Sequence, residues 1–395
     1  MRPVRSYTFR YALIQALYWS NYVTVLGYSS VYLLSCGLTN TMIGILIGIS
    51  GAAAALIQPL TAGYADKPGS LSVKQIACVM AGAALAAAAC LFFVRGSCIL
   101  LTGFLYAICI TLLQALMPFV NSLGTEMIRQ GATLNWGTAR GTGSFVYAAV
   151  SYLAGLIITK AGITCIPPLM MLTYSLLLLS VCIYPFRKGN ASADPPGSAS
   201  PTRLADMSRR YPRFFLMLIG MMLAYISHAS VMTYLYQIVA SKGGGSAQLG
   251  TLMSVMALVE LPALFGFRLF LKKAGSDTWL RLCCISITLH ALAILIAPNM
   301  PFLYCVQLFQ AFGWAIIAIA PVYYITQVIP KEDAVKGQAF NTMAYTIGSV
   351  LASLAGGGLL DIGGAGVVLI FAILTGTAGS FMVGIYSEKL RTSGR

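Results

Sequence analysis

The sequence predicts an all-α membrane protein with twelve spanning helices in two related six-helix halves. Of its 395 residues, 58% are hydrophobic and only 9% are Asp, Glu, Lys or Arg, whereas soluble domains are about 25% charged. The apolar residues fall into twelve runs, and nearly all basic residues lie between alternate runs. Because so few charges cannot cover a water-facing surface, a soluble globular protein is excluded, and the high apolar content excludes a disordered chain.

Each apolar run is long enough to form one spanning helix, which needs about 20 mostly apolar residues. Prolines inside the runs do not oppose this assignment, because neighbouring helices satisfy the backbone groups that a proline frees. The predicted spans are residues 10–34, 41–64, 74–94, 98–127, 136–159, 163–185, 214–239, 248–271, 279–297, 301–328, 336–360 and 364–387.

The positions of the Lys and Arg residues predict the orientation of the chain. With the N-terminus inside and twelve spans, 22 basic residues lie on the inner side and three lie outside, namely Arg95, Lys160 and Lys242. Lys and Arg accumulate in cytoplasmic loops. We therefore expect a multi-pass protein of the cytoplasmic membrane with both termini in the cytoplasm. The net charge of +15 reflects this topology, and we expect no nucleic-acid partner.

The middle of the chain divides the spans into two sets of six. Residues 186–212 are polar, basic and rich in Pro and Ser, which is typical of a flexible linker. The sequence therefore predicts an N-terminal bundle at 1–185, a cytoplasmic linker at 186–212 and a C-terminal bundle at 213–395.

The two halves carry similar residues at a nearly constant spacing. Pro59 and Gly63 match Pro262 and Gly266 at an offset of 203. The tripeptide at 153–155 matches that at 354–356, Leu-Ala-Gly in both, at an offset of 201. This spacing predicts an internal duplication, and two parallel repeats with a binding site between them are a known transporter plan.

Short motifs relate this layout to a known family. Asp66-Lys67-Pro68-Gly69 follows the second span, Gln58-Pro59-Leu60 lies within it, and Gly137-Thr138-Ala139-Arg140 opens the fifth. The chain thereby resembles the major facilitator superfamily, and within it the lactose-permease branch of proton symporters together with phenylpropionate-permease-like proteins. The first motif departs from the family pattern, because Ala62 stands where a Gly is usual and Ser70-Leu71 where two basic residues are usual.

The resemblance implies a secondary active transporter that moves a sugar, a nucleoside or an aromatic acid by alternating access with proton symport. It also implies gating contacts at Asp66, Lys67 and Gly69 that form in one state and break in the other. A proton-driven exporter of drugs or metabolites is the alternative. An intramembrane enzyme or a channel is disfavoured, because the spans hold few catalytic groups and no rings of charge.

Glu260 is the acid that the predicted spans place nearest to the bilayer midplane. An ionisable group at this depth costs about 2.5–3.5 kcal/mol or more, so it usually serves function. Its repeat counterpart is Ile57, so the scaffold does not require an acid there. A carboxyl that can be neutral or charged suits proton coupling, whereas the resemblance implies a contribution to sugar binding. A structural acid that is hydrogen-bonded between helices is the remaining interpretation.

Arg140 is the second charge that breaks the duplication, because Phe340 occupies its repeat position. Helical spacing places Arg140, Ser144 and Tyr147 on one face. A guanidinium beside an aromatic ring suits a ligand with hydroxyl or carboxylate groups. The resemblance implies the same roles, with Tyr147 at the place of the family's ring-stacking Trp. Alternatively, Arg140 lies at the membrane interface and is held by Glu126 or by a lipid phosphate.

Further polar residues lie within the predicted spans. His228 and His290 are proton-coupling candidates, because His changes charge near neutral pH; packing inside a bundle is the alternative for each. The charged coupling network of lactose permease is absent, since Gly313 and Tyr345 occupy two of its places. The remaining candidate substrate-binding residues are Gln307, Gln310, Tyr18, Tyr22 and Asn121.

The partners expected from the sequence are a small-molecule substrate, protons and membrane lipids, and the protein is expected to be a monomer. No cofactor and no metal are expected, because the sequence has neither a phosphate-binding loop nor a metal-ligand cluster. The ten cysteines include no CxxC pair and are interpreted as buried thiols.

Overall fold

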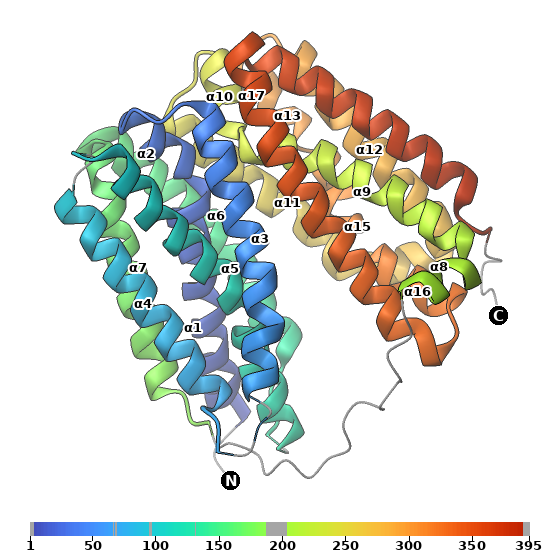
Figure 1. The fold of residues 1–395 in the computed structure, drawn as a ribbon, viewed down its shortest axis with the longest axis horizontal. Coiled ribbons are helices and arrows are strands. Elements are labelled where there is room, and N and C mark those ends of the chain that lie inside the picture. Colours follow the sequence, from blue (N-terminus) through green and yellow to red (C-terminus); the bar gives the residue numbers. More distant parts are fainter. Residues whose placement is uncertain are drawn as a thin grey trace. The chain divides into compact units, whose positions relative to one another are not determined.

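The structure is a computed structural model that describes residues 4–65, 67, 69–94, 97–130, 132–186 and 204–389. Every regular element in these ranges is a helix (Figure 1). The first are α1 (Val4–Tyr22), the π-helix η1 (Val23–Gly27), α2 (Ser29–Ser35), α3 (Asn40–Ala65), α4 (Val73–Val94), α5 (Ile99–Arg129), α6 (Trp136–Ala161), the 3-10 helix η2 (Ile163–Cys165) and α7 (Ile166–Ile183). The others are α8 (Leu204–Arg210), α9 (Pro212–Thr233), α10 (Leu235–Ser241), α11 (Ser246–Lys273), α12 (Ser276–Ile296), α13 (Met300–Val306), α14 (Phe309–Phe312), α15 (Trp314–Ile317), α16 (Ala320–Val328) and α17 (Lys331–Tyr386).

The predicted all-α membrane fold is confirmed. Ten helical stretches of the described residues are long and apolar enough to cross a membrane. One of them, α17, consists of two helices that meet at a kink, because Gly363 and Gly364 have non-helical angles. The φ of Gly364 is +70°, which favours glycine. Together with the nearly continuous helical stretch from α1 through η1 to α2, these helices account for the twelve predicted spans.

Asparagine side chains cap the starts of two of these helices. Asn135 precedes α6, and its Oδ1 accepts a hydrogen bond from the backbone N–H of Thr138 at 3.1 Å. Asn299 caps α13 in the same way through the N–H of Phe302, also at 3.1 Å. These contacts satisfy backbone donors that a helix start leaves without partners.

Both halves of the chain interrupt their first helix, and a tyrosine occupies each interruption. Tyr28 follows the π-helix η1, and its hydroxyl donates to the carbonyl oxygen of Ser151 in α6 at 2.7 Å. Tyr234 separates α9 from α10, and its hydroxyl donates to the carbonyl oxygen of Ser353 in α17. The two tyrosines are 206 positions apart and the two serines 202. The duplication is therefore visible in the hydrogen bonds as well as in the sequence.

A basic side chain near the start of one helix caps the end of another helix in each half. The Nζ of Lys74 donates to the carbonyl oxygens of Cys182 and Tyr184 at 2.7 and 2.9 Å. Arg281 donates to the hydroxyl and the carbonyl oxygen of Ser387 at 2.7 and 2.9 Å. A cation at a helix C-terminus satisfies terminal carbonyls and is attracted by the helix dipole.

The chain divides into two compact units, Met1–Ala193 with Gly244–Leu258, and Asp194–Gly243 with Val259–Arg395. The first half of α11 therefore belongs to the first unit. There, a Cβ on Gly155 of α6 would lie 3.2 Å from the Cα of Gly250 in α11, so glycine allows these two backbones to approach. The domain boundaries predicted from the sequence stay a prediction, and linker residues 187–203 lie outside the described residues.

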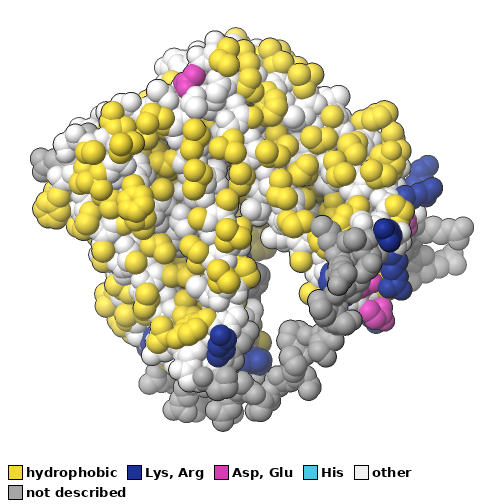
Figure 2. Space-filling view, in the orientation of Figure 1, with side chains coloured by type: hydrophobic (Ala, Val, Ile, Leu, Met, Phe, Trp, Pro, Cys, Tyr) yellow, Lys and Arg dark blue, Asp and Glu magenta, His cyan; other side chains and the backbone are white. Residues whose placement is uncertain are grey.

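Each unit presents an apolar surface to its surroundings. Figure 2 shows hydrophobic side chains over much of the visible face of both units, and Lys and Arg gathered toward one end of each. Close helix packing inside the second unit depends on small residues, since a Cβ on Gly379 of α17 would lie 2.6 Å from the carbonyl oxygen of Gly220 in α9. Without a hydrophobic driving force between helices in lipid, such close contact is a main source of stability.

We predict that removing either helix cap destabilises the protein by about 1–2 kcal/mol, because charged hydrogen bonds to terminal carbonyls are lost. Lys74→Met and Arg281→Met should each lower the thermal unfolding midpoint of the purified protein in detergent. Lys389→Met is the control, since Lys389 is exposed beyond α17. A midpoint equal to that of the control in either variant would contradict this role for the capping residue.

Candidate functional site

An arginine and a tryptophan form the centre of a polar cluster in the first unit. The Cζ of Arg140 in α6 lies 4.5 Å from the ring centroid of Trp19 in α1. Its Nη1 donates to the hydroxyl of Ser144, one turn further along α6, at 3.2 Å. A guanidinium over an indole face gains about 0.5–2 kcal/mol, depending on how dry the site is. The contact with Ser144 and the ring of Trp19 together fix the plane of the guanidinium.

Two partly open tyrosines lie beside the same tryptophan, in addition to the buried Tyr18, whose ring centroid is 5.7 Å from that of Trp19. The ring centroids of Trp19 and Tyr22 are 5.2 Å apart, and those of Trp19 and Tyr147 are 6.1 Å apart in an edge-on arrangement. Tyr22 and Tyr147 lie 6.4 Å apart. Apart from Tyr18, these rings and Arg140 are only half-buried. The structure therefore brings together predicted site residues from two helices, and their partly open surfaces can contact a bound molecule.

A glycine in α6 makes room for this cluster. A Cβ on Gly143 would lie 2.5 Å from the Cδ1 of Trp19 and 3.4 Å from the carbonyl oxygen of Gln15. Glycine at this position therefore lets α1 approach α6 closely enough for Trp19 to reach Arg140. Trp19 was missing from the predicted site residues. The signal that could have found it is Gly143, which stands on the α6 turn next to Arg140.

The second half has an uncharged residue at the position that repeats Arg140. Phe340 of α17 packs its ring 5.1 Å from that of Phe215 in α9. In both halves this position meets an aromatic residue of the first helix of that half. Only the first half uses a cation there. The alternative partner Glu126 pairs with Arg129 of its own helix at 2.7 Å. That Glu126 or a lipid phosphate holds Arg140 stays a prediction.

Two other predicted residues connect α1 to α5. Tyr18 is buried, and its hydroxyl donates to the carbonyl oxygen of Leu113 at 3.2 Å. The Oδ1 of Asn121 accepts a hydrogen bond from the Nε2 of Gln15 at 3.2 Å. These contacts fix the position of α1 against α5. From α1, Trp19 and Tyr22 extend toward α6. A role of Tyr18 and Asn121 in binding stays a prediction.

The second unit contains a histidine stacked on a tryptophan. The rings of His228 in α9 and Trp314 in α15 lie 4.1 Å apart and are nearly parallel, with an interplanar angle of 2°. Trp314 also approaches Tyr345 of α17 at 5.9 Å. His228 is buried, and its Nδ1 has no hydrogen-bond partner among the described residues.

The other histidine is paired with a glutamine. The Nε2 of His290 in α12 lies 3.1 Å from the Oε1 of Gln307. The Nε2 of Gln307 donates to the carbonyl oxygen of Leu303 at 2.9 Å. Gln310 is also buried, and its Nε2 has no hydrogen-bond partner within the described ranges. His290 and Gln307 therefore form one hydrogen-bonded unit at the end of α13.

Gln307 and Gln310 stand where a spanning helix is broken. Residues 300–328 form four short helices, α13 to α16, in place of one continuous helix. Gly313 has non-helical angles (φ −93°, ψ −90°), and the hydroxyl of Ser286 donates to the carbonyl oxygen of Phe309 at 2.9 Å. Irregular backbone at membrane depth is tolerated only where protein or water satisfies its polar groups. Broken helices are a frequent feature of substrate and ion sites in transporters.

Glu260 lies in the part of α11 that belongs to the second unit, two residues before Pro262, and its side chain is half-buried.

Of the gating residues, Asp66 lies outside the described residues. The carbonyl oxygen of Lys67 accepts a hydrogen bond from the Ser70 hydroxyl at 2.6 Å. Gly69 has φ +78°, so its turn favours glycine. Roles in proton coupling and gating stay predictions.

Apolar helices that surround buried polar and aromatic clusters, with broken spanning helices among them, define a membrane transport protein. The chain matches the MFS_1 like family over residues 8–371. It therefore belongs to this family of major facilitator transporters, which is not a class of enzymes. Among the described residues, no group of three or more His, Cys, Asp or Glu could hold a metal ion.

Individual known proteins are similar to the chain at lower identity. A protein of Deinococcus radiodurans that is provisionally named a sugar efflux transporter is 26% identical over 121 residues, which are 31% of this chain and 31% of that protein. The chain therefore matches less than a third of this relative.

Solved structures share the fold over nearly the whole chain. The nucleoside transporter NupG is 14% identical with a TM-score of 0.77, covering 98% of both chains. A bacterial homologue of the iron transporter ferroportin is 12% identical with a TM-score of 0.75, covering 98% of this chain and 100% of its own. A D-xylose–proton symporter is 11% identical with a TM-score of 0.67, covering 99% of both.

We predict that Trp19 determines solute affinity through Arg140. Trp19→Leu removes the aromatic face and should weaken binding by about 2- to 30-fold, the equivalent of a cation–π contact. Trp19→Phe keeps a smaller aromatic face and should lose less. The measurement is solute-dependent thermal stabilisation of the purified protein, with Trp279→Phe in α12 as the control. Equal affinities in wild type and Trp19→Leu would remove Trp19 from the site.

Proposed function

We propose that the protein moves a small organic solute across the cytoplasmic membrane, with both termini in the cytoplasm, by proton symport and as a monomer. The observation that carries the proposal is the Arg140–Trp19–Tyr147 cluster of the first unit. The proposed substrates are sugars, nucleosides and aromatic acids. Each combines a flat or apolar face with hydroxyl or carboxylate groups, and the cluster offers partners for both parts.

The chemistry of the cluster supports this substrate class. A guanidinium donates two parallel hydrogen bonds to a carboxylate or to neighbouring hydroxyls, so its orientation matters as well as its charge. The contact with Trp19 and the hydrogen bond to Ser144 hold the guanidinium of Arg140 in one plane. Tyr22 and Tyr147 supply partly open aromatic surfaces against which a sugar ring, a nucleobase or a benzene ring can pack.

Three residues are the proposed carriers of the coupled proton: Glu260, His228 and His290. Glu260 leads, because a carboxyl inside a spanning helix costs free energy that scaffolds avoid. His228 has a ring nitrogen without a hydrogen-bond partner among the described residues. A proton on that nitrogen would not have to displace an existing contact. For His290, protonation would retain the hydrogen bond to Gln307, whose amide oxygen can accept from it.

Export is the second candidate function. It is favoured by the Deinococcus radiodurans relative that is provisionally named a sugar efflux transporter. The same solute site and the same carboxyl serve either direction, because alternating access is reversible and the gradients decide the net flow. The two candidates differ in whether proton entry accompanies solute entry or solute exit.

We predict that Glu260→Gln abolishes accumulation of solute against its gradient, because a neutral amide cannot release a proton. If Glu260 carries only the proton, equilibrium exchange of labelled for unlabelled solute should persist. If Glu260 binds the solute, exchange should fail as well. Uptake driven by a proton gradient and exchange are measured in the same proteoliposomes, with the exposed Glu332→Gln as the control. Full proton-driven accumulation by Glu260→Gln would exclude Glu260 from coupling.

A further inference from the structure

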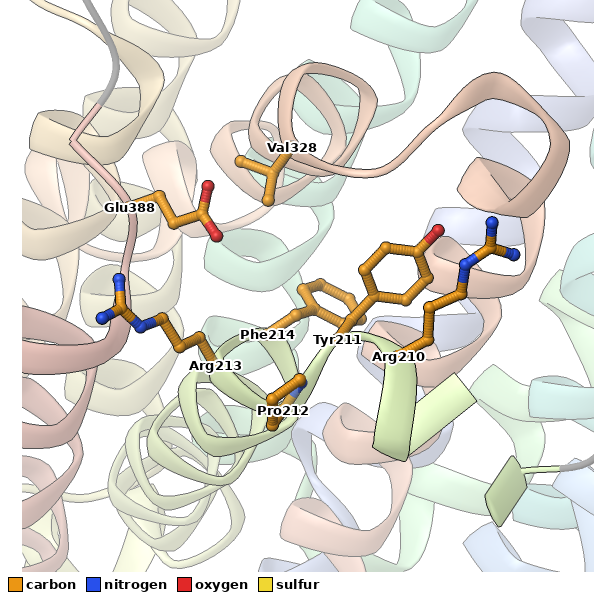
Figure 3. Close-up of a pocket in the computed structure, with 7 residues that line it drawn as sticks. All are labelled: Arg210, Tyr211, Pro212, Arg213, Phe214, Val328 and Glu388. Atoms are coloured by element: carbon orange, nitrogen blue, oxygen red, sulfur yellow. The ribbon is translucent and has the colours of Figure 1, made fainter. Parts of the chain in front are cut away.

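A small cavity of about 200 Å³ opens at one end of the second unit (Figure 3). It lies between the start of α9, the end of α16 and the segment that follows α17. Its volume is below the 300–1,000 Å³ that is usual for drug-sized ligands. The cavity is lined by Arg210, Tyr211, Pro212, Arg213, Phe214, Val328 and Glu388.

The position of the cavity along α9 places it at the level of lipid headgroups. The spanning helix begins at Pro212, and its side chains are mostly apolar from Phe214 onward. Arg210 and Arg213 therefore stand at the boundary between the apolar span and water. By the distribution of basic residues along the chain, this boundary is the cytoplasmic one. Basic pockets at this level are a general feature of lipid headgroup sites.

Charges of both signs face the cavity without neutralising each other. Figure 3 shows the carboxylate of Glu388 and the ring of Tyr211 on opposite sides, with Arg213 on the side of Glu388 and Arg210 beyond Tyr211. Within the described ranges, neither Arg213 nor Glu388 takes part in an ion pair. The backbone N–H of Glu388 donates to the hydroxyl of Tyr324 at 2.8 Å. This contact fixes the backbone from which the Glu388 side chain extends.

The far side of the cavity is held by an ion-pair cluster. Arg210 pairs with Asp333 of α17 at 3.3 Å, and the hydroxyl of Tyr211 donates to the same carboxylate at 3.1 Å. Lys336 also pairs with Asp333, at 3.3 Å. Burial and the hydrogen bond to Asp333 raise the pKa of Tyr211, so its phenol stays neutral. The acid of this cluster is thus already satisfied, and the ring of Tyr211 is fixed toward the cavity.

We propose that this cavity binds the phosphoethanolamine headgroup of a membrane lipid. The phosphate accepts hydrogen bonds from the guanidinium of Arg213, which matches phosphate oxygens in charge and geometry. The ammonium lies between the carboxylate of Glu388 and the face of Tyr211, which attract a cation by charge and by the ring quadrupole. One zwitterionic ligand thereby satisfies both charges that the protein leaves separate.

The carboxylate selects among headgroups. A phosphoglycerol headgroup has the phosphate but no cation, so Glu388 repels it. A phosphocholine headgroup has a cation but no N–H donors, so it cannot donate to the carboxylate. The expected order of affinity is therefore phosphatidylethanolamine first, with phosphatidylglycerol and phosphatidylcholine below it.

The test uses delipidated protein in detergent, titrated separately with each of the three lipids. Thermal stabilisation and the number of retained lipids in native mass spectrometry are measured. Phosphatidylethanolamine should stabilise wild type most. Arg213→Gln should weaken its binding about fivefold, the effect of one basic residue near headgroups. Arg209→Gln is the control, because Arg209 is exposed and does not line the cavity.

Glu388→Gln supplies the deciding comparison. It should weaken phosphatidylethanolamine binding and strengthen phosphatidylglycerol binding, because the attraction for ammonium and the repulsion of the anion are removed together. A substitution that only destabilises the protein would change the binding of both lipids in the same direction, and such a result would overturn the proposal. Stabilisation by inorganic phosphate equal to that by the lipid would also overturn it. These measurements require no transport, so their outcome is independent of the solute and proton proposals.

Discussion

The absence of water in the bilayer core is the constraint on which the rest of this structure depends. A spanning helix can be interrupted only where another group satisfies its backbone. At each interruption of a first helix a tyrosine, Tyr28 or Tyr234, donates its hydroxyl to a serine carbonyl of a neighbouring helix, so a polar group at the interruption has a protein partner. Lys74 and Arg281 cap helix ends in the same repeated manner. The scaffold is therefore a duplicated set of local solutions to one physical problem.

Function is expected where the duplication fails. The position that holds Arg140 against Trp19 in the first half holds Phe340 against Phe215 in the second. The second half packs this position with an aromatic ring instead of a charge, so the fold itself does not require a cation there. The broken helix of residues 300–328 is likewise the place where the second unit buries its glutamines. The two units thus carry different chemistry on related frames, one with a cation among aromatic rings and one with buried histidines and glutamines.

The sequence predicted what depends on local pattern. Apolar run lengths located the twelve spans, and helical spacing placed Arg140 beside Ser144, because one helix turn separates them wherever the helix lies. Contacts between helices could not be predicted in this way. Trp19 reaches Arg140 only because Gly143 lets α1 approach. The hydroxyl of Tyr18 donates to the backbone of α5, while its ring lies edge-on to Trp19. The break around Gln307 depends on neighbours such as Ser286, which are distant in the sequence.

Counterflow in proteoliposomes tests most directly whether the Arg140 cluster binds the transported solute. Vesicles loaded with unlabelled uridine, D-xylose or 3-phenylpropionate are diluted into the labelled compound, and the transient accumulation of label is followed. The account predicts counterflow of at least one compound by wild type and by Arg129→Ala, and its loss in Arg140→Ala, because the cationic partner of the solute is removed. Counterflow by Arg140→Ala with the wild-type half-saturation concentration would contradict the account.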